Sequence, residues 1–454
     1  MDRAKPRSNP TNNRQLEQHL TACLHLHQPA TIVLAFSGGL DSMVLLDLLH
    51  RIQPTANWTL QVVHIHHGLQ PQADSWLAFC QQQCLQRGLP FASHRLQLAG
   101  RHNLEARARE ARYQQLAAYC QQPGTVLVTA HHADDQLETL LLALKRGSGL
   151  DGLAGMPESR PFAGGMLLRP LLAVSKEQLE AYASQQQLSW VEDPSNQDSQ
   201  YDRNFLRQQV LPLLKQRWPA FGRSALRSMD HCQQAARQLD DHWQQQLAPY
   251  LSDSDRRLSL QALHEKPLAD QHSLVRAWLR RHQLNPELSW LQRLQQEVIA
   301  AKDDACPQLQ LQHCWLRRFQ GALYLCSFQP AAPQVSLQWQ GQAELELPAE
   351  LGHLQFVRTD EAPGPDWLPL LDCDSLQVVF GKMNLRFKPA KMPHSKPLKQ
   401  WCRLWGIPPW QRPYLPLLVY EGRLMAVAGQ ASCYPAESAR LWFRYTEPDN
   451  KDQA

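Results

Sequence analysis

Residues 31–52 read TIVLAFSGGLDSMVLLDLLHRI, which is an apolar run, a short Ser/Gly stretch and a second apolar run. The first run, Thr31 to Phe36, is typical of a buried strand, and the second, Met43 to Ile52, has the spacing of a helix. Ser37 to Ser42 therefore forms the turn between them. Adjacent glycines let the backbone approach a ligand, the serines add hydroxyl donors, and the helix presents its positive end. The turn predicts a phosphate site, with pyrophosphate as its natural ligand.

The residues of this turn exclude two common nucleotide-binding motifs. The turn lacks the Gly-Lys-Ser/Thr ending of a Walker A loop and the third glycine of a dinucleotide fingerprint. The remaining alternative is a Ser/Gly turn that binds no ligand. The order of strand, loop and helix favours the phosphate site over that alternative.

The first two hundred residues alternate strand-like and helix-like segments. Such alternation, with almost continuously apolar strands, predicts a doubly wound α/β fold, in which helices cover both faces of a parallel sheet and ligands bind at the carboxyl ends of its strands. The predicted strands are 31–36, 60–65, 90–96 and 125–129, and the predicted helices are 42–52, 73–87, 104–120 and 134–145. A further helix is expected to start at Ser175, with Gln178 completing a capping box.

The chain beyond Asn204 changes character. Residues 205–302 are rich in Gln, Leu and Arg with helical periodicity, which predicts a long connecting helix and then a helical domain. Residues 309–328 alternate like a hairpin with a turn at Gly321. A Pro-rich stretch follows, and short strand-like pieces after it indicate a small α+β domain. The expected domains are a nucleotide-binding catalytic domain with its connecting helix at 1–220, a helical domain at 221–330 and an α+β domain at 331–454.

A second motif, HHADDQLET at residues 131–139, follows the strand at 125–129 and opens a helix. Asp135 and Glu138 are three residues apart and share a helix face, where two carboxylates beside a triphosphate would hold Mg²⁺. The alternative is an acidic first turn that only complements the helix dipole. The neighbouring phosphate turn favours the metal role. A zinc site at His131 and His132 is not supported, because no further ligand stands at a usual spacing.

Bulk properties narrow the class of protein. No segment of the 454 residues is apolar over the ~18 residues of a membrane span, and the first thirty residues lack the apolar core of a signal peptide, which predicts a soluble, cytoplasmic protein. Eleven cysteines without a CxxC pair indicate free thiols. The net charge of +4 hides an uneven distribution, since residues 382–420 carry eight bases and no acid. Such a region suits binding to phosphates.

Taken together, the motifs resemble those of the tRNA(Ile)-lysidine synthetases, which are N-type ATP pyrophosphatases of the PP-loop superfamily. The matching motifs, in the order of that family, are SGGLDS (37–42), HIHHGL (64–69), NLEARAREARY (103–113), HHADDQLET (131–139), KRGSGLDGLAGM (145–156), RPLL (169–172) and EDPSNQDSQYDRN (192–204). The segment KPLKQWCRLWGIPPWQRPYLPLL at 396–418 also looks like a later domain of that family. The resemblance therefore spans nearly the whole chain.

The resemblance implies an enzyme that uses ATP to adenylate the C2 carbonyl oxygen of cytidine 34 in the CAU anticodon of tRNA(Ile). L-lysine then displaces AMP to give lysidine. The residues that the resemblance assigns to the ATP phosphates are Ser37, Gly38, Gly39, Leu40, Asp41 and Ser42. Those assigned to Mg²⁺ and catalysis are Asp41, Asp135 and Glu138, and those assigned to cytidine, phosphate or lysine are His66, Arg112, His131 and Arg203. Both later domains are implied to bind tRNA.

The basic segment is expected to bind the body of the tRNA, with Lys391, Lys396 and Lys399 among its phosphate contacts. Its tryptophans are interpreted as core residues. The sequence leaves the oligomeric state open, with a homodimer as one alternative.

Two rival functions stay open. The first is a tRNA thiolase of the same superfamily, in which paired cysteines such as Cys80 and Cys84 would carry sulfur; we interpret both as core residues. The second is a tRNA-binding protein with a degenerate nucleotide site. The intact carboxylates Asp41, Asp135 and Glu138 oppose this second alternative.

Overall fold

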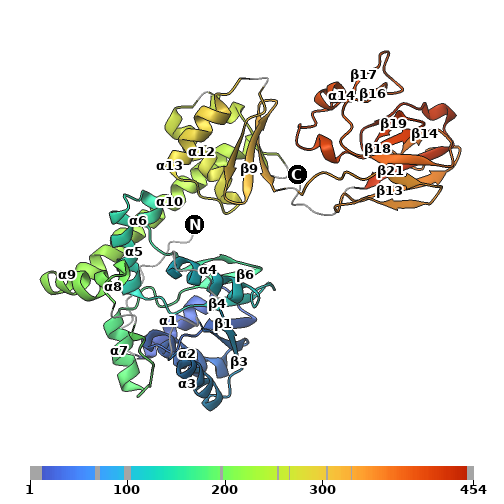
Figure 1. Ribbon diagram of the computed structural model, residues 1–454. Helices are drawn as coiled ribbons and strands as arrows, with labels where there is room; N and C mark the ends of the chain where they lie inside the picture. The colour runs from blue at the N-terminus through green and yellow to red at the C-terminus, as the bar shows by residue number, and fades with distance from the viewer. Residues whose placement is uncertain are drawn as a thin grey trace. The chain divides into compact units, whose positions relative to one another are not determined.

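The computed structural model describes residues 13–66, 72–96, 104–194, 198–252, 255–264, 266–302, 305–328 and 330–446. The chain forms two compact units, residues 1–239 and 240–454 (Figure 1). Within the described ranges, no helix is both long and apolar enough to cross a membrane. All eleven cysteines are free thiols, as predicted.

A six-stranded sheet of order β3-β2-β1-β4-β6-β5 forms the centre of the first unit (Figure 1). Its strands are β1 (Thr31–Ala35), β2 (Thr59–His66), β3 (Phe91–Arg95), β4 (Thr125–Val128), β5 (Ser159–Phe162) and β6 (Gly165–Leu168). Neighbouring strands are parallel except for the pair β5 and β6. The predicted doubly wound α/β fold is confirmed, and all four predicted strands are present.

Strand β1 shows why this sheet is buried on both faces. Ile32 and Leu34 belong to one apolar core and Val33 to the other, and all three are fully buried. The helices that contribute to the first core are α1 (Asn13–His25), α2 (Leu40–Ile52), α3 (Ala73–Gln86) and α7 (Lys176–Gln185), whereas α4 (Leu104–Ala117) contributes to the second. A strand without a polar side can only be central.

The neighbouring parallel strands β1 and β4 bring the two sequence motifs together. The SGGLDS loop follows β1 and opens α2, and the HHADD loop follows β4 and opens α5 (Ala133–Lys145). Both loops therefore lie at the carboxyl edge of the sheet. The predicted capping box is also present, because the Ser175 backbone N–H donates to Gln178 Oε1 at 2.8 Å and the Gln178 N–H donates to Ser175 Oγ at 3.4 Å.

The hairpin of β5 and β6 extends the sheet beyond the predicted strands. Each strand has only four residues, and Pro161 lies within β5, so the sequence carries little strand signal. An edge strand tolerates proline because it need not donate on its outer side. Gly165 lets β6 approach β4 closely, since a Cβ atom there would lie 2.2 Å from the Thr125 carbonyl oxygen.

The predicted connecting helix is divided into several elements. They are α8 (Asp202–Phe205), the π-helical segment η3 (Leu206–Val210), α9 (Leu211–Arg217) and α10 (Phe221–Leu247). The break before α10 has a simple cause, because Pro219 forces the preceding Trp218 into an extended conformation with ψ of 90°. A short helix, α6 (Leu150–Leu153), follows α5.

The first part of the second unit combines helices with a four-stranded sheet of order β7-β10-β9-β8. The elements are β7 (Arg257–Ser259), α11 (Gln261–His264), α12 (Leu268–Arg281), α13 (Leu288–Arg293), η5 (Leu294–Ile299), β8 (Gln308–Leu311), β9 (Cys314–Phe319) and β10 (Ala322–Ser327). The predicted hairpin is β9 with β10. It turns at Gln320 and Gly321, whose φ values of 44° and 73° suit a two-residue hairpin loop.

The last part of the chain contains a five-stranded sheet, β11-β15-β18-β19-β20, and a four-stranded sheet, β12-β13-β21-β14. Their strands are β11 (Leu337–Trp339), β12 (Glu344–Glu346), β13 (His353–Arg358), β14 (Leu368–Leu370), β15 (Leu376–Val379), β18 (Leu417–Tyr420), β19 (Arg423–Val427), β20 (Ala431–Ser432) and β21 (Leu441–Thr446). The helix α14 (Leu398–Leu404) and the strand pair β16 (Arg386–Phe387) and β17 (Lys396–Pro397) complete it.

The fold of this last part agrees with the predicted α+β class. Trp401 is buried there, and its indole N–H donates to the Phe387 carbonyl oxygen at 2.8 Å, so it is a core residue as interpreted from the sequence. The domain boundaries at 220 and 330 stay a prediction.

Candidate active site

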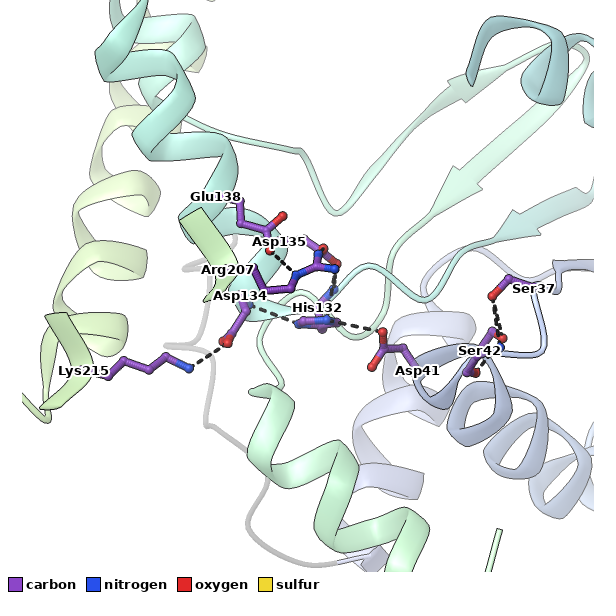
Figure 2. A network of polar contacts seen from close by, with 10 residues as sticks. Ser37, Asp41, Ser42, His132, Asp134, Asp135, Glu138, Arg207 and Lys215 are labelled. Atoms are coloured by element: carbon purple, nitrogen blue, oxygen red, sulfur yellow. Dashed lines mark hydrogen bonds and ion pairs between the residues drawn. The ribbon is translucent and has the colours of Figure 1, made fainter. Parts of the chain in front are cut away.

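The SGGLDS loop is held in shape by hydrogen bonds of its own serines (Figure 2). The hydroxyl oxygens of Ser37 and Ser42 lie 3.0 Å apart, and Ser42 Oγ donates to the Gly39 carbonyl oxygen at 2.9 Å. Helix α2 has no side-chain cap at its N-terminus, which leaves its first N–H groups for an anion. The side chain of Leu40 packs on the apolar core, so this residue offers the ligand only its backbone.

The two glycines of the loop differ in what they require. Gly38 has a φ of +82°, and a Cβ atom there would lie 2.8 Å from Cys80 Sγ and 3.1 Å from Val191 Cγ2. Gly39 has an ordinary φ of −73°, and the nearest atom to its Cβ position is 3.6 Å away. The conformation of the loop therefore requires glycine at position 38 and not at position 39.

This difference gives a matched pair of variants. We expect Gly38→Ala to cost about 1–3 kcal/mol of folding stability through backbone strain. Gly39→Ala should leave stability nearly unchanged and raise KM for ATP, because its methyl group takes space beside the approaching phosphates. Denaturant unfolding and ATP titration measure the two effects. Equal loss of stability in both variants would contradict the geometry.

His132 connects the two loops. It is the N-cap of α5, where its Nδ1 atom accepts the Asp134 N–H at 3.2 Å, so Nε2 carries the ring proton. Nε2 lies 3.5 Å from Asp41 Oδ2 and 3.7 Å from Asp135 Oδ2 (Figure 2). Burial opposes a charged ring, but the charge of Asp135 and the hydrogen bond and charge of Asp41 outweigh it and raise the pKa of His132 to about 9. The ring therefore takes a second proton readily once it gives up the Asp134 hydrogen bond.

The two carboxylates on α5 are joined by Arg207. Its Nε donates to Glu138 Oε1 at 2.7 Å and its Nη2 to Asp135 Oδ1 at 3.2 Å (Figure 2). Burial raises the pKa of Glu138 even though Arg207 acts against it. The pKa of Asp135 is lowered, because His132 and Arg207 outweigh its burial. Two carboxylates three residues apart thus have opposite acid–base tendencies.

Asp134 belongs to a separate ion-pair group. Lys215 of α9 donates to Asp134 Oδ2 at 2.7 Å and to Glu177 Oε1 of α7 at 2.8 Å. Lys215 therefore ties α9 to two other helices. Together with Arg207, it fixes the segment 206–217 against α5.

The residues around these carboxylates are compatible with a magnesium ion that arrives with ATP. The described residues contain no group of three His, Cys, Asp or Glu side chains arranged to hold a metal. Two carboxylate oxygens, Asp41 Oδ1 and Glu138 Oε2, are nevertheless buried without a hydrogen-bond partner. Unpartnered buried acceptors are costly, and Mg²⁺ commonly takes one or two carboxylates and completes its shell with phosphates and water.

The remaining predicted contact residues fall into two groups. The first group lies beside the acidic network, by which we mean Asp41, Asp135 and Glu138 with His132 and Arg207. It consists of His131, Arg112 and Arg203. Arg112 and Asp135 both act on the pKa of His131, and Arg203 acts on that of Glu138. Burial lowers the pKa of His131 to about 3, so its ring is neutral, and its Nδ1 lies 2.9 Å from Thr129 Oγ1.

The contacts of the other group do not include the acidic residues of α5 in the described part of the chain. His66, at the end of β2, has its Nε2 3.3 Å from Asp74 Oδ1. Lys391, Lys396 and Lys399 belong to the second unit, where Lys396 Nζ lies 5.2 Å from the centroid of the Trp401 ring. Their roles stay predictions.

Comparison with known proteins agrees with this geometry. Residues 9–214 match the PP-loop domain, residues 258–324 the TilS substrate binding domain and residues 376–440 the TilS substrate C-terminal domain. The tRNA(Ile)-lysidine synthase of Serratia proteamaculans is 42% identical over 423 residues, which cover 92% of this chain and 94% of that protein. This chain belongs to the tRNA(Ile)-lysidine synthase family. The synthase of Yersinia pestis is 43% identical over 415 residues, 88% of this chain and 89% of that one.

A solved structure outside the tRNA(Ile)-lysidine synthase family is also similar. It is the U34-tRNA thiolase NcsA from Methanococcus maripaludis, at 15% identity and a TM-score of 0.40, covering 48% of this chain and 77% of that one. A likeness at this level carries no argument about function. In the present chain Cys80 and Cys84 are fully buried, and burial raises their pKa values to about 12 and about 11. Both are core thiols, as interpreted from the sequence.

Arg207 is the residue of this lysidine synthase site that the sequence analysis missed. It stands four residues after Arg203 in the run DRNFLR, a spacing that places two residues on one helix face. That spacing is the signal that would have pointed to Arg207. The role of His132 as an N-cap has no comparable signal, because histidine is not a favoured capping residue.

The pKa of His132 leads to a prediction about the pH dependence of stability. A pKa raised from 6.5 to about 9 means that the imidazolium stabilises the fold below pH 6.5 and that this contribution disappears as the pH rises through 9. This pKa shift contributes at most about 3 kcal/mol to the free energy of unfolding. His132→Asn keeps a capping side chain without the titration. We expect the stability difference between wild type and variant, measured by urea unfolding, to shrink between pH 6.5 and 9; a constant difference would contradict the assignment.

Proposed function

We propose that the protein joins L-lysine to C2 of cytidine 34 in the CAU anticodon of tRNA(Ile), using ATP and releasing AMP and diphosphate. The observation that carries the proposal is the 42% identity to a tRNA(Ile)-lysidine synthase over more than nine tenths of both chains. The PP-loop match over residues 9–214 and the loop geometry support the use of ATP.

In the first proposed step the C2 carbonyl oxygen of cytidine attacks the α-phosphorus of ATP, and the bond to diphosphate breaks. The N–H groups at the start of α2 and the hydroxyls of Ser37 and Ser42 take up the charge of the departing diphosphate. We propose Asp41, Asp135 and Glu138 as ligands of Mg²⁺, which supplies neutralisation of phosphate charge when it is bound. The unpartnered oxygens of Asp41 and Glu138 support this assignment.

In the second step the ε-amine of lysine attacks C2, the C2–O bond breaks and AMP leaves. The ε-ammonium must first lose a proton. We assign that proton to Glu138 in the state in which it holds no Mg²⁺, because burial raises the pKa of its carboxyl group. Asp135, with its lowered pKa, stays ionised and attracts the ammonium group.

The test is nucleoside analysis of tRNA(Ile) after incubation with ATP and labelled lysine. The proposal expects a labelled lysidine peak in equal amount with released AMP. A sulfur-containing nucleoside formed in the presence of a sulfur donor would instead indicate the thiolase rival. Tight tRNA binding without any AMP would indicate the binding-protein rival.

We propose that the domains at 221–330 and 331–454 bind the body of the tRNA, as the two substrate-domain matches support. We also propose that the enzyme acts in the cytoplasm, where tRNA, ATP and free lysine meet. Its oligomeric state stays open.

The basic segment gives a prediction for tRNA affinity. Replacing Lys391, Lys396 and Lys399 together by Gln should flatten the slope of log K against log salt by about two to three units, because each lost phosphate contact removes about 0.9. We also expect a raised KM for tRNA and little change in kcat. Arg440→Gln, at an exposed residue 3.7 Å from Asp360, is the control. An unchanged slope with an unchanged KM would show that the three lysines do not contact tRNA.

A further inference from the structure

Four arginines gather around one tyrosine beside the acidic network. The guanidinium carbons of Arg109 and Arg112 each lie 5.4 Å from the centroid of the Tyr113 ring, and that of Arg160 lies 6.0 Å from it. Arg169 is buried, acts on the pKa of Tyr113, and donates through Nη1 to the Pro157 carbonyl oxygen at 2.8 Å. We call these four side chains the arginine cluster.

Within the described part of the chain, no carboxylate balances the positive charge of the arginine cluster. Among the side chains that the structure describes, none of the four arginines is within 4.0 Å of a carboxylate, whereas Arg51 pairs with one and Arg207 and Arg358 each pair with two. The cluster instead lowers the pKa of Tyr113 in spite of the burial of that hydroxyl. Like charges held together in a partly buried place repel each other, and an anion relieves that cost.

The arginine cluster lies on the opposite side of the HHADD loop from the SGGLDS loop. Arg109 and Arg112 come from α4, Arg160 from β5 and Arg169 from the residue after β6, while the SGGLDS loop follows β1. Because β4 stands between β1 and β6 in the sheet, the HHADD loop separates the two positive regions. The charges of both Asp135 and the arginines act on the pKa of His131 in that loop.

The number of cations indicates which anion binds. The ATP phosphates already have the uncapped end of α2 and the two serines of the SGGLDS loop. The α-carboxylate of lysine needs only one guanidinium fork. Four guanidinium groups spread over α4, β5 and the end of β6 match a row of negative charges, and an RNA backbone next to the reacting base presents such a row.

We propose that the arginine cluster is an RNA-binding subsite, which holds the backbone phosphates that flank the target cytidine. The proposal rests on the proposed function, because it takes the RNA to be the anticodon loop of the tRNA. It makes Arg109, Arg160 and Arg169 contact residues in addition to Arg112. It also positions the cytidine from the side of the site that faces away from ATP.

The test uses binding of an isolated anticodon stem–loop of tRNA(Ile) at several salt concentrations. Arg109→Gln and Arg160→Gln are the main variants, because both side chains reach solvent and we expect the fold to tolerate their loss. We expect each to reduce the slope of log K against log salt by about 0.7 to 0.9 for the stem–loop and for full-length tRNA. Arg160→Lys should keep the slope, since the charge is retained.

Two controls separate this subsite from other contributions. Arg14→Gln removes an exposed arginine of α1 beside Arg51 and Thr55, at the edge of the sheet where β2 begins, and should leave the slope unchanged. The triple lysine variant in 391–399 should change the slope for full-length tRNA and not for the stem–loop. KM for ATP and for lysine should stay unchanged in the two main variants.

Three results would overturn the proposal: an unchanged slope for the stem–loop, a raised KM for lysine with an unchanged slope, or a raised KM for ATP with an unchanged slope. The second would assign the arginine cluster to the lysine carboxylate and the third to diphosphate. The binding measurement requires no turnover. A protein that makes no lysidine but shows the reduced slopes would therefore fail the proposed function and keep the RNA subsite.

Discussion

Asp41→Asn, Asp135→Asn and Glu138→Gln will each lower kcat for lysidine formation by about 10²-fold or more, because each removes a charge that acts on the transition state. The three carboxylates form one network through His132 and Arg207, so loss of one disturbs the acid–base balance of the others. Single-turnover AMP release measures the effect. We expect the Kd for tRNA to stay within about twofold of wild type, since carboxylates supply no positive charge for the phosphates of the tRNA backbone.

The matched control is Asp134→Asn. Asp134 stands in the same helical turn as Asp135, but its carboxylate pairs with Lys215 and not with the network. It should keep most of the activity. Near-normal AMP release in all three test variants, or an equal loss in the control, would overturn the assignment.

Arg207→Gln will destabilise the fold by about 3–5 kcal/mol, the usual cost of leaving a buried charge without its partner. Glu138 is the charge at issue, because its side chain is fully buried and Arg207 Nε lies 2.7 Å from it. Urea unfolding measures the loss. Arg217→Gln, at an exposed residue at the end of α9, is the control and should change stability by less than about 0.5 kcal/mol.

The pH dependence of the Arg207→Gln variant separates a lost charge partner from lost packing. Without Arg207 the pKa of Glu138 rises further above its ordinary 4.5. A carboxyl group whose pKa is raised in the folded state loses stability as the pH rises above its unfolded value, so this variant should be less stable at pH 7 than at pH 5 relative to wild type. The double variant with Glu138→Gln should recover much of the loss. A loss independent of pH, and not recovered, would indicate packing alone.

The sequence predicted those parts of the fold and the site that depend on residues close together in the chain. The four predicted strands, the loop at 37–42 and the α5 carboxylates each depend on spacings of a few residues, which period and turn chemistry can specify. The sequence analysis did not predict the β5–β6 hairpin, because its strands are short and half-exposed. The sequence analysis did not predict the arginine cluster, because Arg109 and Arg160 are far apart in the chain and the order of the strands in the sheet brings them near each other.

The π-helical segment at 206–210 has a consequence for how this chain can change. Arg207 within it and Lys215 beyond it both reach acidic residues of α5. One residue turns a helix by about 100°, so an insertion or deletion between these two cations would rotate one of them away from α5. A substitution at the exposed Gln209 leaves both in place. In evolutionary terms, this stretch is constrained in its length more than in its composition.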